Sequence, residues 1–286
     1  MDYSKFIEIL NKHIFEGEKK DLLRKIAENP ERFIGLFRPT KPHVKILQHL
    51  LQSHEIRMGS ALEKIIEKAL ENFGFTNLPK NILNENGENL SLDQYFYKDG
   101  KYYFVEQKVR DDHDSSKKRG QISNFETKLE ILYKKHGSDL TGIMYFIDPD
   151  LNKNMNFYIS EIEKLKNFYG IDILLLYGSE FFEFLKQGNF WNNMLEWLKK
   201  WKNNLPELPE LNFDASPEEN FKEIKDLALI YWRKILENDK LWDEGIIKVL
   251  SKEGKTLQLL LNYFKTNPSN PYQQIAQKLS ERLNVF

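Results

Sequence analysis

Asp99 and Gly100 stand between two runs of strand-forming residues, and this dipeptide restricts the fold more than any other feature of the sequence. An Asp-Gly pair in such a setting favours a two-residue β-hairpin turn, because both central residues of that turn need a positive φ. We therefore expect two antiparallel strands, at about 90–98 and 101–110. The hairpin excludes an all-helical chain.

The rest of the chain alternates between helical and strand patterns. Apolar residues recur at spacings of three and four from Met58 to Phe73, which predicts a helix with one buried face. Short apolar runs at 143–147 and 171–176 predict buried strands. Further helices are expected at about 121–136, 180–187 and 190–203. This order predicts an α/β fold with a central mixed sheet flanked by helices.

Helical segments flank this core on both sides. We expect a helical N-terminal region at 1–54 and a core at 55–203. Residues 204–217 hold three of the ten prolines and no sustained periodicity, so we interpret them as a linker. A helical C-terminal region follows at 218–286, with helix starts at Ser216-Pro217 and Asn270-Pro271.

The composition limits the possible chemistry. The 286 residues include no cysteine, which excludes disulfides, thiolate zinc sites and a cysteine nucleophile. The formal charge is only -1, so any attraction to nucleic acid must come from a local charge cluster. No run approaches the roughly 18 apolar residues of a membrane span, and the first residues do not resemble a signal peptide. We expect a soluble, cytoplasmic protein.

The hairpin register places three charged residues on one strand face. If Lys98 pairs with Lys101, then Asp93 lies opposite Glu106, and Lys108 projects to the same face two residues later. Two adjacent carboxylates repel each other, and a divalent cation such as Mg²⁺ relieves that repulsion. This set indicates metal-dependent phosphodiester hydrolysis, in which the lysine orients or deprotonates water or stabilises negative charge.

The same spacing also fits an exposed strand face, on which Asp, Glu and Lys are common. Against that alternative, Glu106 and Lys108 lie within an otherwise apolar run at 102–109, and buried charges need partners or a metal. A charged loop follows, in which Asp111, Asp112 and His113 are candidates for a second metal. A solvated loop is the simpler interpretation of those three adjacent residues.

Residues 115–135 form a basic segment. They contain six Lys or Arg residues against two Glu residues, a local charge of +4 to which a phosphate backbone can bind. The basic residues are Lys117, Lys118, Arg119, Lys128, Lys134 and Lys135. We take Lys117, Lys118, Arg119 and Gln121 as the candidate phosphate or base contacts, although a charged helix terminus explains them equally.

Asp93, twelve intervening residues and then Glu106-Gln107-Lys108 resemble the PD-(D/E)xK nuclease signature, with Leu92 in place of the usual proline. The longer stretch 105–121 resembles type II restriction endonucleases, in particular the HinfI/HpyAIV-like group. The segments 57–63 and 176–185 are also similar to members of that superfamily.

The resemblance implies a Mg²⁺-dependent homodimer that cleaves both strands of double-stranded DNA. It implies that Asp93 and Glu106 are metal ligands and that Lys108 is the catalytic lysine. Glu63 matches a glutamate that the first core helix contributes in many such enzymes, but Ser60 to Glu63 is also a helix capping box. The alternative functions are a structure-specific or repair nuclease of the same fold, and a non-catalytic DNA-binding module.

Overall fold

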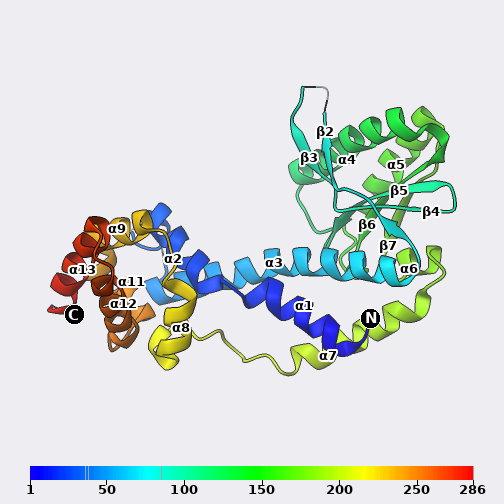
Figure 1. Cartoon of the computed structure of the whole chain (residues 1–286). Coiled ribbons are helices and arrows are strands. Elements are labelled where there is room, and N and C mark those ends of the chain that lie inside the picture. The colour runs from blue at the N-terminus through cyan, green and yellow to red at the C-terminus, as the bar shows by residue number, and fades with distance from the viewer. Residues whose placement is uncertain (36, 38, 85, 286) are drawn as a thin grey trace. The chain divides into compact units, whose positions relative to one another are not determined.

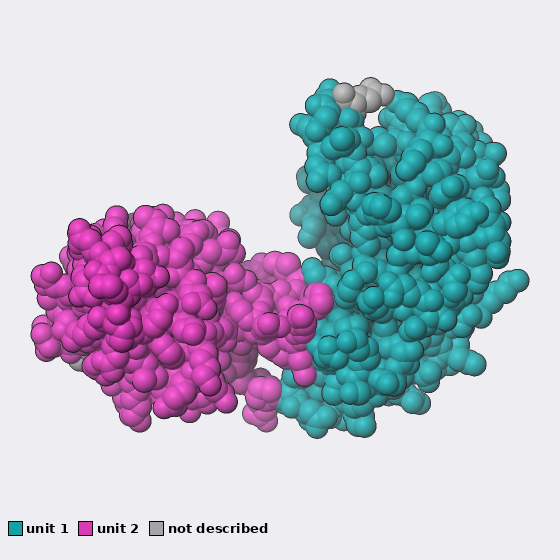
Figure 2. All heavy atoms as spheres, viewed as in Figure 1, with its two compact units in different colours: residues 1–10, 58–205 teal, residues 11–57, 206–286 magenta. Residues whose placement is uncertain are grey.

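The structure, a computed structural model, describes residues 1–35, 37, 39–84 and 86–285. The chain divides into two compact units (Figures 1 and 2). Unit 1 comprises residues 1–10 and 58–205, and unit 2 comprises residues 11–57 and 206–286. Helices α1 (Tyr3–Phe15) and α3 (Pro42–Asn72) contribute residues to both units.

Unit 1 contains a five-stranded mixed sheet in the order β1-β4-β5-β6-β7. β1 and β5 pair with β4 in antiparallel fashion, whereas β5, β6 and β7 are parallel to one another. This confirms the predicted α/β class and the mixed sheet. The strands are β1 (Thr76–Asn77), β4 (Gln94–Lys98), β5 (Lys101–Lys108), β6 (Leu140–Phe146) and β7 (Ile173–Tyr177).

The hairpin between β4 and β5 has the predicted register. Lys98 pairs with Lys101, and the pairing continues back to Gln94, the first residue of β4, which pairs with Val105. Asp99 and Gly100 have φ values of 50° and 83°, the positive values that this turn requires. Asp93 lies one residue before β4, at the point where the ladder ends.

Helices cover both faces of this sheet (Figure 1). On one face, α4 and α5 bury a core that includes Phe104, Phe125 and Tyr158. On the other face, Tyr145 of β6 stacks on Phe181 of α6, with ring centroids 4.6 Å apart. The helices of unit 1 after the hairpin are α4 (Ser115–His136), α5 (Met155–Tyr169), α6 (Glu180–Phe184) and α7 (Gly188–Lys202), with a 3-10 turn at Gly137–Asp139.

A second, two-stranded ribbon leads into Asp93. It consists of β2 (Asn81–Leu83) and β3 (Asn89–Ser91), which we did not predict as separate strands. Leu92 then joins the ribbon to Asp93. Its side chain is buried, and its backbone N–H donates to the carbonyl of Lys80 at 2.8 Å. The backbone before Asp93 is therefore held by the core.

Two of the helix boundaries differ from the prediction. The helical stretches expected before residue 54 and from Met58 onward are one continuous helix, α3, of 31 residues. α4 begins at Ser115 instead of near 121, because the carboxylate of Asp114 accepts the backbone N–H of Lys117 at 2.9 Å and caps the helix. The charged loop after β5 is correspondingly short.

Unit 2 is helical and has its own apolar core. The predicted helix starts are confirmed, since α8 begins at Pro217 and α13 at Asn270. Within the described residues, no helix combines the length and apolar character that crossing a membrane requires. Apart from parts of α1 and α3, its helices are α2 (Glu18–Glu28), α8 (Pro217–Ile224), α9 (Leu229–Glu237), α10 (Asp239–Asp243), α11 (Ile246–Leu250), α12 (Lys255–Thr266) and α13 (Asn270–Leu283), with 3-10 turns at Pro30–Arg32 and Phe213–Ala215.

Candidate active site

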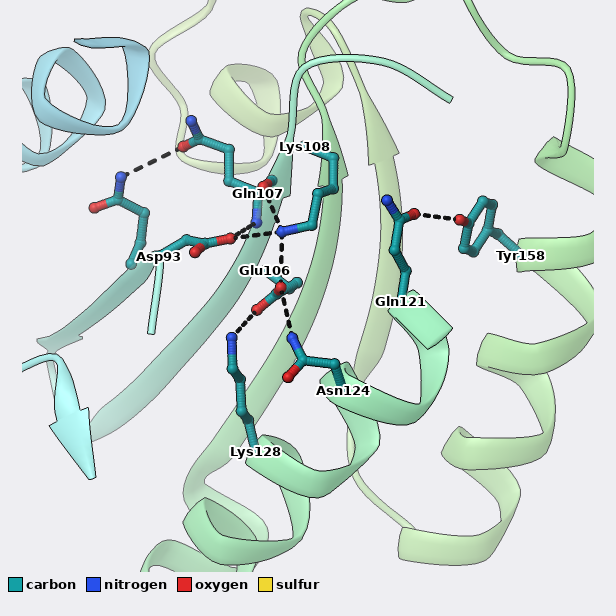
Figure 3. A network of polar contacts seen from close by, with 9 residues as sticks. Asp93, Glu106, Gln107, Lys108, Gln121, Asn124, Lys128 and Tyr158 are labelled. Atoms are coloured by element: carbon teal, nitrogen blue, oxygen red, sulfur yellow. Dashed lines mark hydrogen bonds and ion pairs between the residues drawn. The ribbon is translucent and has the colours of Figure 1, made fainter. Parts of the chain in front are cut away.

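Lys108 lies between the two predicted carboxylates (Figure 3). Its Nζ donates to Oδ2 of Asp93 at 3.1 Å and to Oε1 of Glu106 at 2.7 Å. A third bond, of 3.0 Å, goes to the carbonyl of Gln107. The structure thus brings together Asp93, Glu106 and Lys108, the three residues that the hairpin register had placed on one face.

Asp93 reaches this position although it lies outside the strand ladder. Its Oδ2 also accepts the backbone N–H of Gln107 at 2.7 Å, so its carboxylate is fixed to β5. Burial raises the pKa of Asp93 and the charge of Glu106 raises it further, against the opposing effect of Lys108. Its carboxylate is poorly solvated and benefits from a nearby cation.

The charge of Lys108 is maintained by its partners. Burial acts to lower the pKa of Lys108, but Glu106 and Asp93 outweigh that effect and raise the pKa above its usual value. In the metal-free protein, the lysine is therefore an ammonium ion at neutral pH. As such it donates hydrogen bonds and has no lone pair with which to accept a proton.

Lys128 of α4 completes the site, through a contact that we did not predict from the sequence. Its Nζ donates to Oε2 of Glu106 at 2.7 Å, and Asn124, one turn earlier, donates to Oε1 at 3.0 Å. Only 5% of the Lys128 surface is exposed, and its ammonium is paired with Glu106 inside the protein. Its spacing from Phe125 and Leu132 places it on the inward helix face, a signal that was available in the sequence.

Glu63 of α3 lies near this cluster. Burial raises its pKa from 4.5 to about 7, and the charge of Asp93 adds to that effect. The capping-box interpretation is wrong, because α3 is continuous through Ser60 and has no N-terminus there. The backbone carbonyl of Glu63 accepts the side-chain amide of Gln94 at 2.8 Å, which connects α3 to the start of β4.

Comparison with known proteins identifies the family. The family model described as "Type II restriction endonuclease, HinfI" matches residues 2–82 and 75–202, which is more than half of the chain. The chain belongs to the HinfI family of type II restriction endonucleases. It is therefore a site-specific deoxyribonuclease, as the resemblance implied, and nothing in the match favours the alternative functions. No curated protein and no solved structure gave a match.

Two of the four residues that we predicted to bind DNA have partners within the endonuclease. The ammonium of Lys118 donates to Oδ1 of Asn154 at 3.2 Å, and the amide oxygen of Gln121 accepts the hydroxyl of Tyr158 at 2.5 Å. Lys117 and Arg119 are exposed in the first turns of α4. These two are better placed for contact with phosphate.

Asp111 of the endonuclease is buried. We had interpreted residues 111–113 as a solvated loop, and for Asp111 that interpretation is wrong. The carboxylate accepts the backbone and side-chain N–H groups of Asn154 at 3.0 and 2.9 Å, and the hydroxyl of Tyr177 at 3.0 Å. These contacts tie the segment after β5 to β7 and to the start of α5. Asp111 is a structural carboxylate.

The donor set of the endonuclease fits a shared hard cation. Asp93 and Glu106 each offer an oxygen within 3.1 Å of the Lys108 ammonium, so a positive charge already lies between them. In the part of the chain that the structure describes, no group of three or more His, Asp or Glu residues is arranged to hold a metal. The two carboxylates supply part of a metal site, and Mg²⁺ typically completes its shell with water and substrate phosphate.

Proposed function

We propose that this endonuclease hydrolyses phosphodiester bonds of double-stranded DNA at the site formed by Asp93, Glu106 and Lys108, in a PD-(D/E)xK arrangement. One observation carries the proposal. A single ammonium lies within 3.1 Å of two carboxylates, at the end of a β-hairpin, in a member of a DNA-cleaving family.

Asp93 and Glu106 would hold Mg²⁺ as carboxylate ligands. Glu63 is a third acidic candidate, because its raised pKa reports a poorly solvated carboxyl group beside Asp93. Bound there, Mg²⁺ lowers the pKa of coordinated water and stabilises negative charge on a phosphoryl oxygen. The backbone N–H of Gln107 fixes the carboxylate of Asp93, and the side-chain amide of Asn124 fixes that of Glu106.

Lys108 would stabilise negative charge on the scissile phosphate. Its raised pKa favours this role over that of a general base, since a protonated lysine cannot accept a proton. The side chain is 27% exposed, so it is the more accessible of the two lysines that contact Glu106.

DNA would bind across the start of α4. Lys117 and Arg119 are exposed there and follow the active-site strand by one short loop. Phosphate contacts of this kind provide much of the affinity, without sequence selectivity. The absence of cysteine from the sequence suits a reducing cytoplasm.

A homodimer would cut both strands, because one active site cleaves one strand and a palindromic duplex has two-fold symmetry. Light scattering on the protein without DNA should give about twice 34.1 kDa. A monomeric mass that persists with bound duplex would contradict the dimer.

Plasmid digestion tests the function. With Mg²⁺ the wild-type enzyme should produce discrete bands, and with EDTA it should leave the plasmid intact. Nonspecific degradation would favour a structure-specific nuclease. Absence of cutting, with DNA binding retained, would favour a non-catalytic module.

A further inference from the structure

Glu106 is held by two lysines that contact different oxygens of its carboxylate. Lys108 donates to Oε1 and also to Asp93, whereas Lys128 donates to Oε2. The Glu106 side chain is only 1% exposed, and the Lys128 side chain only 7%. The two lysines therefore differ in access to solvent and in the side of the carboxylate that they occupy.

We propose that Lys128 is a positioning residue that balances the charge of Glu106 and keeps its carboxylate in place while the site contains no metal. The proposal rests on the proposed function, because it treats Glu106 as a metal ligand. It assigns the two lysines separate roles. Lys108 is the lysine that serves the reaction, and Lys128 is the one that maintains the site.

The position of Lys128 on α4 supports this role. Phe125 and Leu129, its neighbours on the helix, are fully buried in the core beneath the sheet. A buried ammonium without a counter-charge is strongly unfavourable, and so is a buried carboxylate. The pair of Lys128 and Glu106 removes both penalties together. Asn124 adds a second hydrogen bond from the same helix, so α4 donates to both carboxylate oxygens of Glu106.

Lys108 is the cation that can be released. It lies between Asp93 and Glu106, where a cation shared by these two carboxylates would also lie, and a divalent ion would replace the charge that it supplies. Lys128 donates to the other oxygen of Glu106, Oε2. Loss of the Lys128 charge should therefore destabilise the metal-free protein and strengthen its attraction for a divalent cation.

The test compares Lys128→Met with wild type, because methionine keeps a long apolar side chain and removes the charge. In EDTA the variant should melt about 4–8 °C lower than wild type. Saturating Mg²⁺ without DNA should restore most of that loss. Calorimetric titration with Mg²⁺ alone should show a dissociation constant about 3- to 10-fold lower than that of wild type.

Lys134→Met is the matched control, because Lys134 lies on the same helix with its side chain 55% exposed and pairs with Glu130. It should leave both the melting temperature and Mg²⁺ binding unchanged. The proposal would be overturned if the melting temperature of Lys128→Met fell equally with and without Mg²⁺ and its Mg²⁺ affinity were unchanged. Lys128 would then contribute to packing alone.

A double-mutant cycle keeps the test decisive if Lys128→Met does not fold in EDTA. Lys128→Met/Glu106→Gln leaves no unpaired charge from this pair, so it should fold and lose less stability than the sum of the single variants. Additive losses, or failure of the double variant to fold, would contradict the proposal. This cycle needs no metal, so it remains informative even if wild type binds no Mg²⁺ and the proposed function fails.

Discussion

The Nζ of Lys108 lies 2.7 Å from Oε1 of Glu106, two residues earlier on β5. Alternate residues of a strand share a face, so this contact follows directly from the strand conformation. The same ammonium also reaches Asp93, which arrives from the other arm of the hairpin. Local backbone geometry thus brings two carboxylates and one ammonium group into a single ion cluster.

The two carboxylates should be indispensable for cleavage. Asp93→Ala and Glu106→Ala should each abolish detectable plasmid cutting, because each removes a proposed Mg²⁺ ligand. Calorimetry should show weakened Mg²⁺ binding in both. DNA binding in a gel-shift assay should survive, and it serves as the control for folding. Cleavage at the wild-type rate by either variant would refute the assignment.

Lys108 should affect the chemical step without affecting metal binding. Lys108→Met removes the charge proposed to stabilise the phosphate, so the single-turnover cleavage rate should fall by about 10²- to 10³-fold. Mg²⁺ affinity should be retained or increased. A variant that cuts as fast as wild type in saturating Mg²⁺ would show that this lysine has no chemical role.

Glu63 should make metal-free stability depend on pH. Its pKa is raised from 4.5 to about 7, so between these values the folded protein binds more protons at this group than the unfolded chain does. The stability contribution therefore decreases as pH rises through this window. Glu63→Gln abolishes the decrease, and at pH 8 in EDTA it should be more stable than wild type by about 1–2 kcal/mol, after allowance for partial exposure.

Urea unfolding at pH 5 and pH 8 measures this effect, and the advantage of Glu63→Gln should be several-fold smaller at pH 5. Glu196→Gln on the exposed surface of α7 is the control and should show no such dependence. An equal difference at both pH values would mean that Glu63 does not titrate in this range.

Asp111 should matter for stability. Asp111→Asn removes a charge that accepts hydrogen bonds from Asn154 and Tyr177, and it buries an amide N–H group where an acceptor is needed. The free energy of unfolding should fall by about 1–3 kcal/mol. Thermal melts measure this loss of stability. Asp112→Asn, at an exposed neighbouring position, is the control and should leave the stability nearly unchanged.

Lys117 and Arg119 should contribute to DNA binding without sequence selectivity. Replacing both with Gln should weaken binding to specific and random duplexes alike, and should make the slope of log K against log salt shallower by about one unit per lost contact. Lys164→Gln, at a 67% exposed position of α5, is the control. If the double variant kept the wild-type slope of log K against log salt, the start of α4 would not contact DNA phosphates.

The hairpin and its charged face were predictable from the sequence because they depend on neighbours in the chain. The turn at Asp99-Gly100 determines which residues of β4 and β5 are opposed, and strand alternation then groups Glu106 with Lys108. The family was likewise recognisable from the spacing of these residues and from the charged stretch that follows. Each of these inferences uses separations of less than about twenty residues.

Only the tertiary structure decided which charges are buried and with what. Lys128 looked like one more lysine of a basic segment, but packing of α4 on the sheet brings it to Glu106. Asp111 acquired its partners from β7 and from Asn154, the residue before α5, and the continuity of α3 removed the helix start proposed at Ser60. The physical reason is that the free-energy cost of a charge depends on its burial and on its partners. Burial in turn depends on elements distant in the chain, which no local pattern specifies.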